Sequence, residues 1–242
     1  MAAAALWSAA ATVTLLVGMV LAYRNMVGLR WTALIMAFGA GAIISAVAYQ
    51  LVLGGVVAAG RFAAIGVGIA VGAMTYYLAD RWVDSLGGKD RLDFEGGQAQ
   101  GSGTGILLGS LLDGVPESLV LGLSLVHSPQ VSAAFVFAVA ISNVPQGLGG
   151  TAGMLSAGWP KRRITWLWLA VCALSIVAAV LGYGLGAAFP GLSGASIDAF
   201  AAGALLVMLT DSMIPESLQH GGRETGLSLV IGFGVATAMA FA

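Results

Sequence analysis

Long apolar runs are the feature that most restricts how this chain can fold. A spanning helix needs about 20 mostly apolar residues, and polar breaks divide the chain into eight such segments. Only 9% of the residues are charged, which is too few to cover the surface of a soluble domain. We therefore expect an all-α membrane protein, a single transmembrane domain of residues 1–242 built as a bundle of eight helices. The predicted spans are about 5–22, 31–53, 62–79, 104–126, 131–155, 164–188, 197–217 and 225–242, with a cytoplasmic loop at 80–103.

The positions of Lys and Arg predict the orientation of these spans. With the N-terminus outside, nine of the ten basic residues lie in cytoplasmic loops, and only Arg61 lies in an outer loop. This is the bias that the positive-inside rule describes. An odd number of spans would break the alternation, so both termini are expected outside. We expect a multi-pass protein of a cell membrane, and specifically of a bacterial inner membrane.

Charge and cysteine content exclude several other classes of protein. The net charge is −1 and no clustered basic face can be assembled, so nucleic acid is not an expected partner. The single cysteine, Cys172, excludes an internal disulfide and a cysteine-rich metal site. We expect the lipid bilayer as a partner and no organic cofactor.

Two acidic residues lie near the middle of the fourth span. Asp113 and Glu117 are four residues apart and therefore share one helix face, which Ser110 extends. An ionised side chain at the centre of a spanning helix costs about 2.5 to 3.5 kcal/mol on translocon scales, and two neighbouring acids repel each other. A bound cation would relieve both costs. Pro116 has no N–H, so the carbonyl of Leu112 lacks its helical donor and is a further oxygen ligand.

The fifth span repeats this pattern with neutral polar residues. Ser142, Asn143 and Gln146 surround Pro145, at a depth similar to that of the acids if spans four and five are antiparallel. The two motifs are then expected to face each other across one site. A third copy, with Asp211, Pro215 and Glu216, closes the seventh span near its cytoplasmic end.

These motifs resemble those of a known family. The segments Asp113–Ser118 (DGVPES) and Ser142–Gly147 (SNVPQG) are similar to the paired H-N-x-P-E-G motifs in spans four and five of the ZRT/IRT-like (ZIP) metal transporters. The eight spans, the long loop after span three and the I-P-E element of span seven also match, so the resemblance covers essentially the whole chain. It implies transport of a divalent metal ion (zinc, manganese, iron, cobalt or cadmium) into the cytoplasm, by a homodimer whose transport sites lie between spans four and five.

The sequence also departs from the family pattern. Asp113 replaces the first His of the family's span-four motif, Gly114 replaces its Asn, and Gln146 replaces the Glu of the second motif, so only Glu117 is fully retained. We therefore expect one bound metal at most. The remaining donors are mostly oxygen atoms, which suit manganese or another hard cation better than zinc. The predicted metal ligands are Asp113, Glu117, Ser142, Asn143 and Gln146, and the predicted pathway residues are Gln50, Ser110, Asp211, Glu216 and His220.

Other interpretations of the same residues remain open. Asp113 and Glu117 could be buried acids satisfied by neighbouring helices, and the fifth-span residues could make ordinary hydrogen bonds between helices. The loss of the family's His and second Glu favours a relative that no longer transports metal and acts as a sensor, a subunit or a carrier of another solute. An enzyme is not expected. The Gly191–Gly194 pattern of rhomboid-type proteases lacks a base on the correct membrane side, because His220 is predicted on the opposite side.

Overall fold

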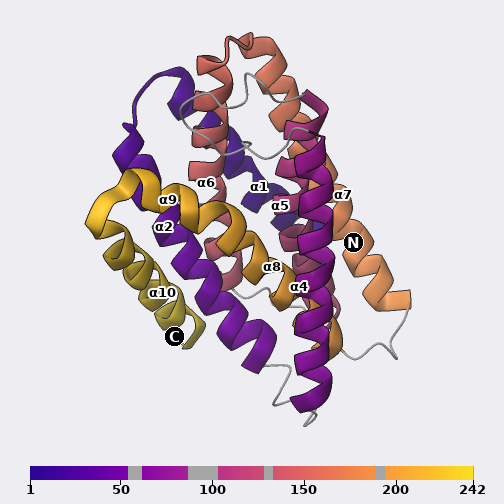
Figure 1. The fold of residues 1–242 in the computed structure, drawn as a ribbon. Coiled ribbons are helices and arrows are strands. Elements are labelled where there is room, and N and C mark those ends of the chain that lie inside the picture. The colour runs from indigo at the N-terminus through magenta and orange to yellow at the C-terminus, as the bar shows by residue number, and fades with distance from the viewer. Residues whose placement is uncertain (54–61, 87–102, 128–132, 189–193, 242) are drawn as a thin grey trace.

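The computed structural model describes residues 1–53, 62–86, 103–127, 133–188 and 194–241. Each regular element among these residues is a helix (Figure 1). Most of the predicted loop 80–103 and residues 191–193 of the protease-like pattern lie outside the described residues. The elements are α1 (Ala2–Tyr23), α2 (Leu29–Ala46), η1 (Val47–Leu53), α4 (Phe62–Ser85), α5 (Gly103–His127), α6 (Ala133–Ser156), α7 (Lys161–Ala188), α8 (Gly194–Met208), η3 (Leu209–Met213), α9 (Ile214–Gly221), η4 (Gly222–Glu224) and α10 (Thr225–Phe241).

The long apolar helices indicate a multi-pass membrane protein. Within the described residues, six helical stretches are long and apolar enough to cross a bilayer. The last of them, Ala195–Phe241, contains 47 residues and turns back at Gly222, whose φ is 70°. Helix α6 is not among the six, and it contains the polar fifth-span motif. The six stretches are Ala2–Tyr23, Leu29–Leu53, Phe62–Ser85, Leu107–Val126, Lys161–Ala188 and Ala195–Phe241.

The helices pack as four close pairs: α1 with α6, α2 with α10, α4 with α8, and α5 with α7. In each pair, one glycine of each helix lies so close to the partner's backbone that an added Cβ would overlap a carbonyl oxygen. Such glycines let helix backbones approach closely in a membrane protein. The reciprocal glycines are Gly18 and Gly147, Gly41 and Gly232, Gly72 and Gly203, and Gly122 and Gly182.

All four pairs are parallel. In the α2–α10 pair, the Ser228 hydroxyl donates to the Leu34 carbonyl at 2.7 Å, and Ser45 and Thr237 hydroxyls lie 2.8 Å apart nearer the other end. Residue numbers therefore rise together along both helices. The glycine contacts of the other three pairs follow the same rule.

Polar contacts bring three turns to one end of the bundle (Figure 1). At the end of α1, the Tyr23 hydroxyl donates to the Lys161 carbonyl at 2.8 Å, next to the α6–α7 turn. At the start of α2, Arg30 pairs with Glu224 at 2.9 Å, next to the α9–α10 turn. The Glu224 backbone N–H, and then Arg30, lower the pKa of the Glu224 carboxyl. The turns α1–α2, α6–α7 and α9–α10 are therefore neighbours.

Two local features differ from the sequence-based expectation. Helix α4 continues to Ser85 rather than ending at 79, because a helix does not have to stop where its apolar span stops. The second and seventh spans each contain a π-helical segment, η1 and η3, which the sequence pattern did not predict. A π-helical turn holds an additional residue, changes which side chains point inward, and is frequent at functional sites. Here these segments contain Gln50 and Asp211.

Candidate functional site

All five predicted metal ligands are buried. Asp113 and Glu117, on α5, are 2% and 1% exposed, and the three α6 residues are between 0% and 4% exposed. The two helices are continuous through Pro116 and Pro145, so each proline leaves one carbonyl without its helical donor. The structure thus places two acids and several neutral oxygen atoms in the interior of the bundle.

Asp113 is held by a residue that the sequence analysis missed. The Tyr76 hydroxyl, on α4, donates a 2.6 Å hydrogen bond to Oδ1 of Asp113, and Tyr76 itself is 2% exposed. A hydroxyl donating to a carboxylate makes a short, strong hydrogen bond. The hydroxyl of a tyrosine well inside an apolar segment needs a polar partner. The position of Tyr76 in the third span could therefore have identified it from the sequence.

Glu117 has a different environment. Its Oε1 atom is buried and has no hydrogen-bond partner in the part of the chain that the structure describes. Asp113 is near enough to interact with it electrostatically. A buried polar atom without a partner is rare in folded proteins and calls for a specific explanation, such as an ion or a water molecule. Glu117 therefore provides a carboxylate oxygen that is available to a cation.

The three polar residues of α6 point to three different neighbours. Ser142 donates to the Val139 carbonyl at 2.9 Å, and Gly39 of α2 packs against its Cα. Asn143 donates from Nδ2 to the Ala11 carbonyl of α1 at 3.0 Å. Gln146 donates from Nε2 to the Met213 sulfur of η3 at 3.7 Å. Each side chain has a structural contact, and these contacts do not draw the three residues toward Asp113.

Helices α5 and α6 are not a close pair. The main partner of α5 is α7, and α6 packs mainly against α1 and α2. Gly114 of α5 lies beside Ser175 of α7, because a Cβ added to it would be 3.2 Å from the Ser175 hydroxyl oxygen. In this conformation, the acids of α5 and the amides of α6 belong to two adjoining regions.

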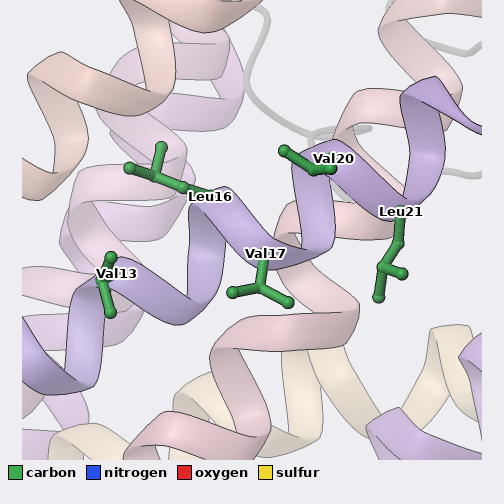
Figure 2. Close-up of a pocket in the computed structure, with 5 residues that line it drawn as sticks. All are labelled: Val13, Leu16, Val17, Val20 and Leu21. Atoms are coloured by element: carbon green, nitrogen blue, oxygen red, sulfur yellow. The ribbon is translucent and has the colours of Figure 1, made fainter.

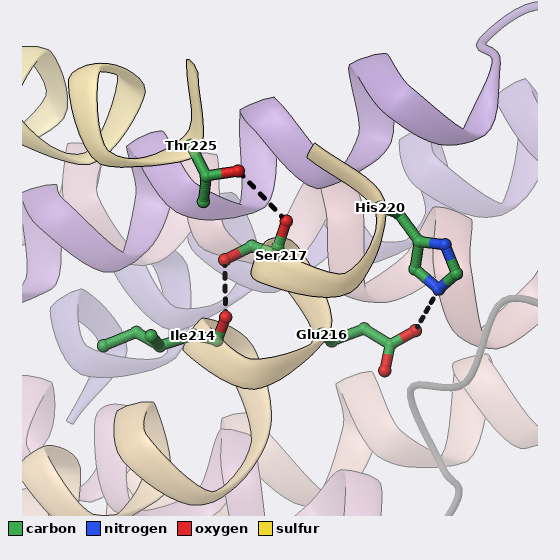
Figure 3. Close-up of polar contacts among 5 residues, drawn as sticks. All are labelled: Ile214, Glu216, Ser217, His220 and Thr225. Carbon is green, nitrogen blue, oxygen red and sulfur yellow. Dashed lines mark hydrogen bonds and ion pairs between the residues drawn. The ribbon is translucent and has the colours of Figure 1, made fainter. Parts of the chain in front are cut away.

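The predicted pathway residues lie in three different environments. Ser110 is buried on α5, and the Nε2 atom of Gln50 is buried in η1 without a hydrogen-bond partner within the described ranges. In α9, His220 Nε2 and Glu216 Oε1 lie 3.4 Å apart, with side chains 14% and 13% exposed (Figure 3). Asp211 is exposed and lines a surface groove beside α4, whereas Leu209 and Met213 form the buried side of η3.

Within the described part of the chain, no group of three or more His, Cys, Asp or Glu side chains could hold a metal ion. No family model matches the chain, and no curated protein matches it significantly. The resemblance to the ZIP transporters thus rests on the motifs and the pattern of spans in the sequence.

Proposed function

We propose that this protein transports a divalent transition metal ion into the cytoplasm through a site centred on Asp113 and Glu117, as the ZIP resemblance implies. The observation that carries the proposal is the buried Oε1 atom of Glu117, which has no hydrogen-bond partner among the described residues. An acid at this depth is functional by default. A cation is the kind of ligand that best matches the negative charge of two adjacent buried acids.

The packing supports a bundle of eight spans with both termini outside. Eight alternating spans require spans 1 and 5, 2 and 8, 3 and 7, and 4 and 6 to run in the same directions, and these are the four parallel pairs. The end of the bundle that holds Lys161, Arg30 and the α9–α10 turn is then the cytoplasmic end. The protein acts as a homodimer in a bacterial inner membrane.

Each acid has a defined role in the proposed cycle. Together, Asp113 and Glu117 neutralise a divalent ion, which removes the cost of their own burial. Tyr76 holds one oxygen of Asp113, and Glu117 offers a free one. Protonation of either carboxylate weakens the site and promotes release. Neutral oxygen donors complete the coordination, so manganese is the favoured ion.

The remaining polar residues extend the route in both directions. Gln50 contributes near the outer end, Ser110 lies one turn from Asp113, and the Glu216–His220 pair receives the ion at the cytoplasmic end. Asp211 does not belong to this route, because it lines a groove on the outside of the helix bundle, beside α4.

Uptake into proteoliposomes tests the proposal. Labelled manganese, iron, cobalt, zinc and cadmium would be supplied to vesicles containing the wild type, Asp113→Asn, Glu117→Gln, or the control Glu224→Gln, whose acid is exposed. We expect uptake that falls by roughly tenfold to a hundredfold in the first two variants, because even a residue that only orients a metal ligand contributes this much, and that is unchanged in the control. If no metal enters faster than into empty vesicles under any pH gradient, the chain is not a transporter of these ions.

One observation favours a second candidate function. Ser142, Asn143 and Gln146 are all engaged in structural contacts, as expected of a relative that binds metal as a sensor or a subunit without moving it. Isothermal titration with Mn²⁺ separates the two functions. Binding that requires Glu117 without any uptake would support the sensor or subunit.

A further inference from the structure

A groove of about 300 Å³ runs along the outer face of α1 (Figure 2). It is lined by the aliphatic side chains of Val13, Leu16, Val17, Val20 and Leu21. These residues recur every three or four positions and therefore form one face of the helix. Arg24 ends α1 and follows Val20 by four residues, so it continues the same face. The apolar groove therefore leads to a basic residue, which is exposed.

Three more cations lie at this end of α1. The Tyr23 hydroxyl donates to the Lys161 carbonyl at 2.8 Å, and the Lys161 ammonium nitrogen lies 5.2 Å from the centre of the Tyr23 ring. Lys161 begins α7 and is followed by Arg162 and Arg163, and all three are exposed. Together with Arg24, they form the α1–α7 basic cluster.

No acidic side chain offsets this charge within the same helices. The sequence has no Asp or Glu in residues 1–79 or 118–197, which include all of α1, α6 and α7. In the part of the chain that the structure describes, no carboxylate from another element pairs with the cluster either, and Glu224 at this end of the bundle pairs with Arg30. A basic cluster at the end of membrane helices attracts anionic lipid headgroups.

The cluster lies at the depth of lipid headgroups. Asn143, near the middle of α6, donates to the Ala11 carbonyl of α1. Arg24 is about 20 Å further along α1, at 1.5 Å per residue, whereas half of the hydrocarbon core is only about 15 Å thick. Trp159 precedes the basic residues of α7 and Trp166, which is 64% exposed, follows them. Such aromatic residues are typical of the membrane interface.

We propose that the α1 groove and the α1–α7 basic cluster together bind an anionic phospholipid of the phosphatidylglycerol type. The phosphate accepts hydrogen bonds from Arg24 and Lys161, and an acyl chain lies along Val17 and Val20. An ethanolamine or choline headgroup carries a cation of its own, which the cluster repels. A glycerol headgroup carries none, so the anionic lipid is the one of the three that matches the charge of the site.

Native mass spectrometry of the delipidated full chain tests this proposal without any transport measurement. Glycerol, ethanolamine and choline phospholipids with identical acyl chains would be titrated against the wild type, Arg24→Gln and Lys161→Gln. The control is Arg81→Gln, which removes an exposed cation of α4, a helix that pairs with α8. We expect the wild type and the control to prefer the glycerol lipid by roughly 20- to 30-fold, and each of the other two variants by roughly fivefold, because one basic residue near an anionic lipid contributes about fivefold.

A second pair of variants tests the groove itself. Val17→Trp fills the groove and should weaken binding of all three lipids by a similar factor, without changing the preference among them. Val230→Trp is the matched control, because Val230 is an exposed valine of α10, as Val17 is of α1. Circular dichroism confirms that each variant is folded.

Several results would overturn the proposal. They are equal binding of the three lipids by the wild type, a preference that survives unchanged in Arg24→Gln and Lys161→Gln, an equal loss in Arg81→Gln, and unchanged binding in Val17→Trp. A dimer mass without bound lipid overturns it as well, and identifies this face as an interface between two copies of the chain.

Discussion

Asp113 and Glu117 are one helical turn apart, yet their environments differ in a way that matters for a bound ion. Asp113 accepts a short hydrogen bond from Tyr76, which holds its carboxylate in place. Glu117 has a buried oxygen without a protein donor within the described residues, so its desolvation is uncompensated. The carboxylate of Asp113 is therefore held in position before an ion binds, whereas Glu117 is the acid whose burial a bound cation stabilises most.

We predict that Glu117→Gln stabilises the empty protein. Glutamine has nearly the same shape as glutamate and avoids the cost of either burying a charge or taking up a proton on folding. Unfolding in metal-free detergent at pH 8 should therefore cost roughly 1 to 3 kcal/mol more than in the wild type. Mn²⁺ should raise the thermal midpoint of the wild type and leave that of Glu117→Gln unchanged. The exposed Glu224→Gln is the control. Lower stability of Glu117→Gln in the absence of metal would show that a protein group satisfies Glu117.

Tyr76→Phe should affect both the fold and the site. Loss of the hydroxyl leaves a buried carboxylate oxygen of Asp113 without that donor, which costs about 1 to 3 kcal/mol of unfolding free energy. The half-saturating concentration for metal uptake should rise by roughly tenfold, the lower range for a residue that orients a metal ligand. Tyr77→Phe is the matched control, because Tyr77 is the next residue and is 42% exposed. Equal effects of the two changes would exclude a specific role for Tyr76.

The sequence predicted the buried acids but not the partners of the polar residues around them. Depth and a spacing of four identified Asp113 and Glu117, because the cost of a charge in lipid depends on position along a span. The partner of Asn143 could not be predicted in this way. Its hydrogen bond to Ala11 depends on the packing of α1 against α6, and these helices are far apart in the sequence.

At the scale of the elements, glycine contacts decide which helices pair. Gly72 of α4 lies against the Phe200 carbonyl of α8, whereas Gly66 of the same helix has no atom within 4 Å of its expected Cβ position. Gly72→Ala should force the two helices apart and cost about 3 kcal/mol or more in unfolding free energy, as overpacking against a rigid backbone does. Gly66→Ala should be neutral or slightly stabilising. Similar unfolding midpoints for the two variants in detergent would contradict this role of Gly72.

The helices were more predictable than their pairing. Apolar runs of about 20 residues can be recognised directly in a sequence, and each predicted span overlaps a described helix. With 36 glycines in the chain, however, the sequence does not show which of them meet a neighbour's backbone. The π-helical segments around Gln50 and Asp211 were missed for a related reason. The π-helical segments depend on which backbone N–H and C=O groups bond to each other, and the pattern of side chains in the sequence does not predict this.

At the scale of the whole molecule, two independent observations identify the same end of the bundle. The contacts of Tyr23 with Lys161 and of Arg30 with Glu224 gather three turns at one end. The sequence places most of the basic residues in those same turns and in the loop after α4. At the opposite end, the ring of Tyr49 in η1 packs on that of Phe241, with centroids 5.2 Å apart. Positive charge and packing thus agree on which turns share a side.

This agreement can be tested by labelling single cysteines in intact cells. The one native cysteine, Cys172, is buried and should react slowly, so the wild type is a suitable background. Met26→Cys and Ser156→Cys lie at exposed positions at the basic end, and Leu53→Cys and Phe241→Cys lie at exposed positions at the other end. Because positively charged turns remain in the cytoplasm, a membrane-impermeant maleimide should label the second pair readily and the first pair only after the cells are opened. Labelling of Phe241→Cys together with Met26→Cys from one side would mean that the number of spans between them is even rather than odd, and the eight-span topology would be wrong.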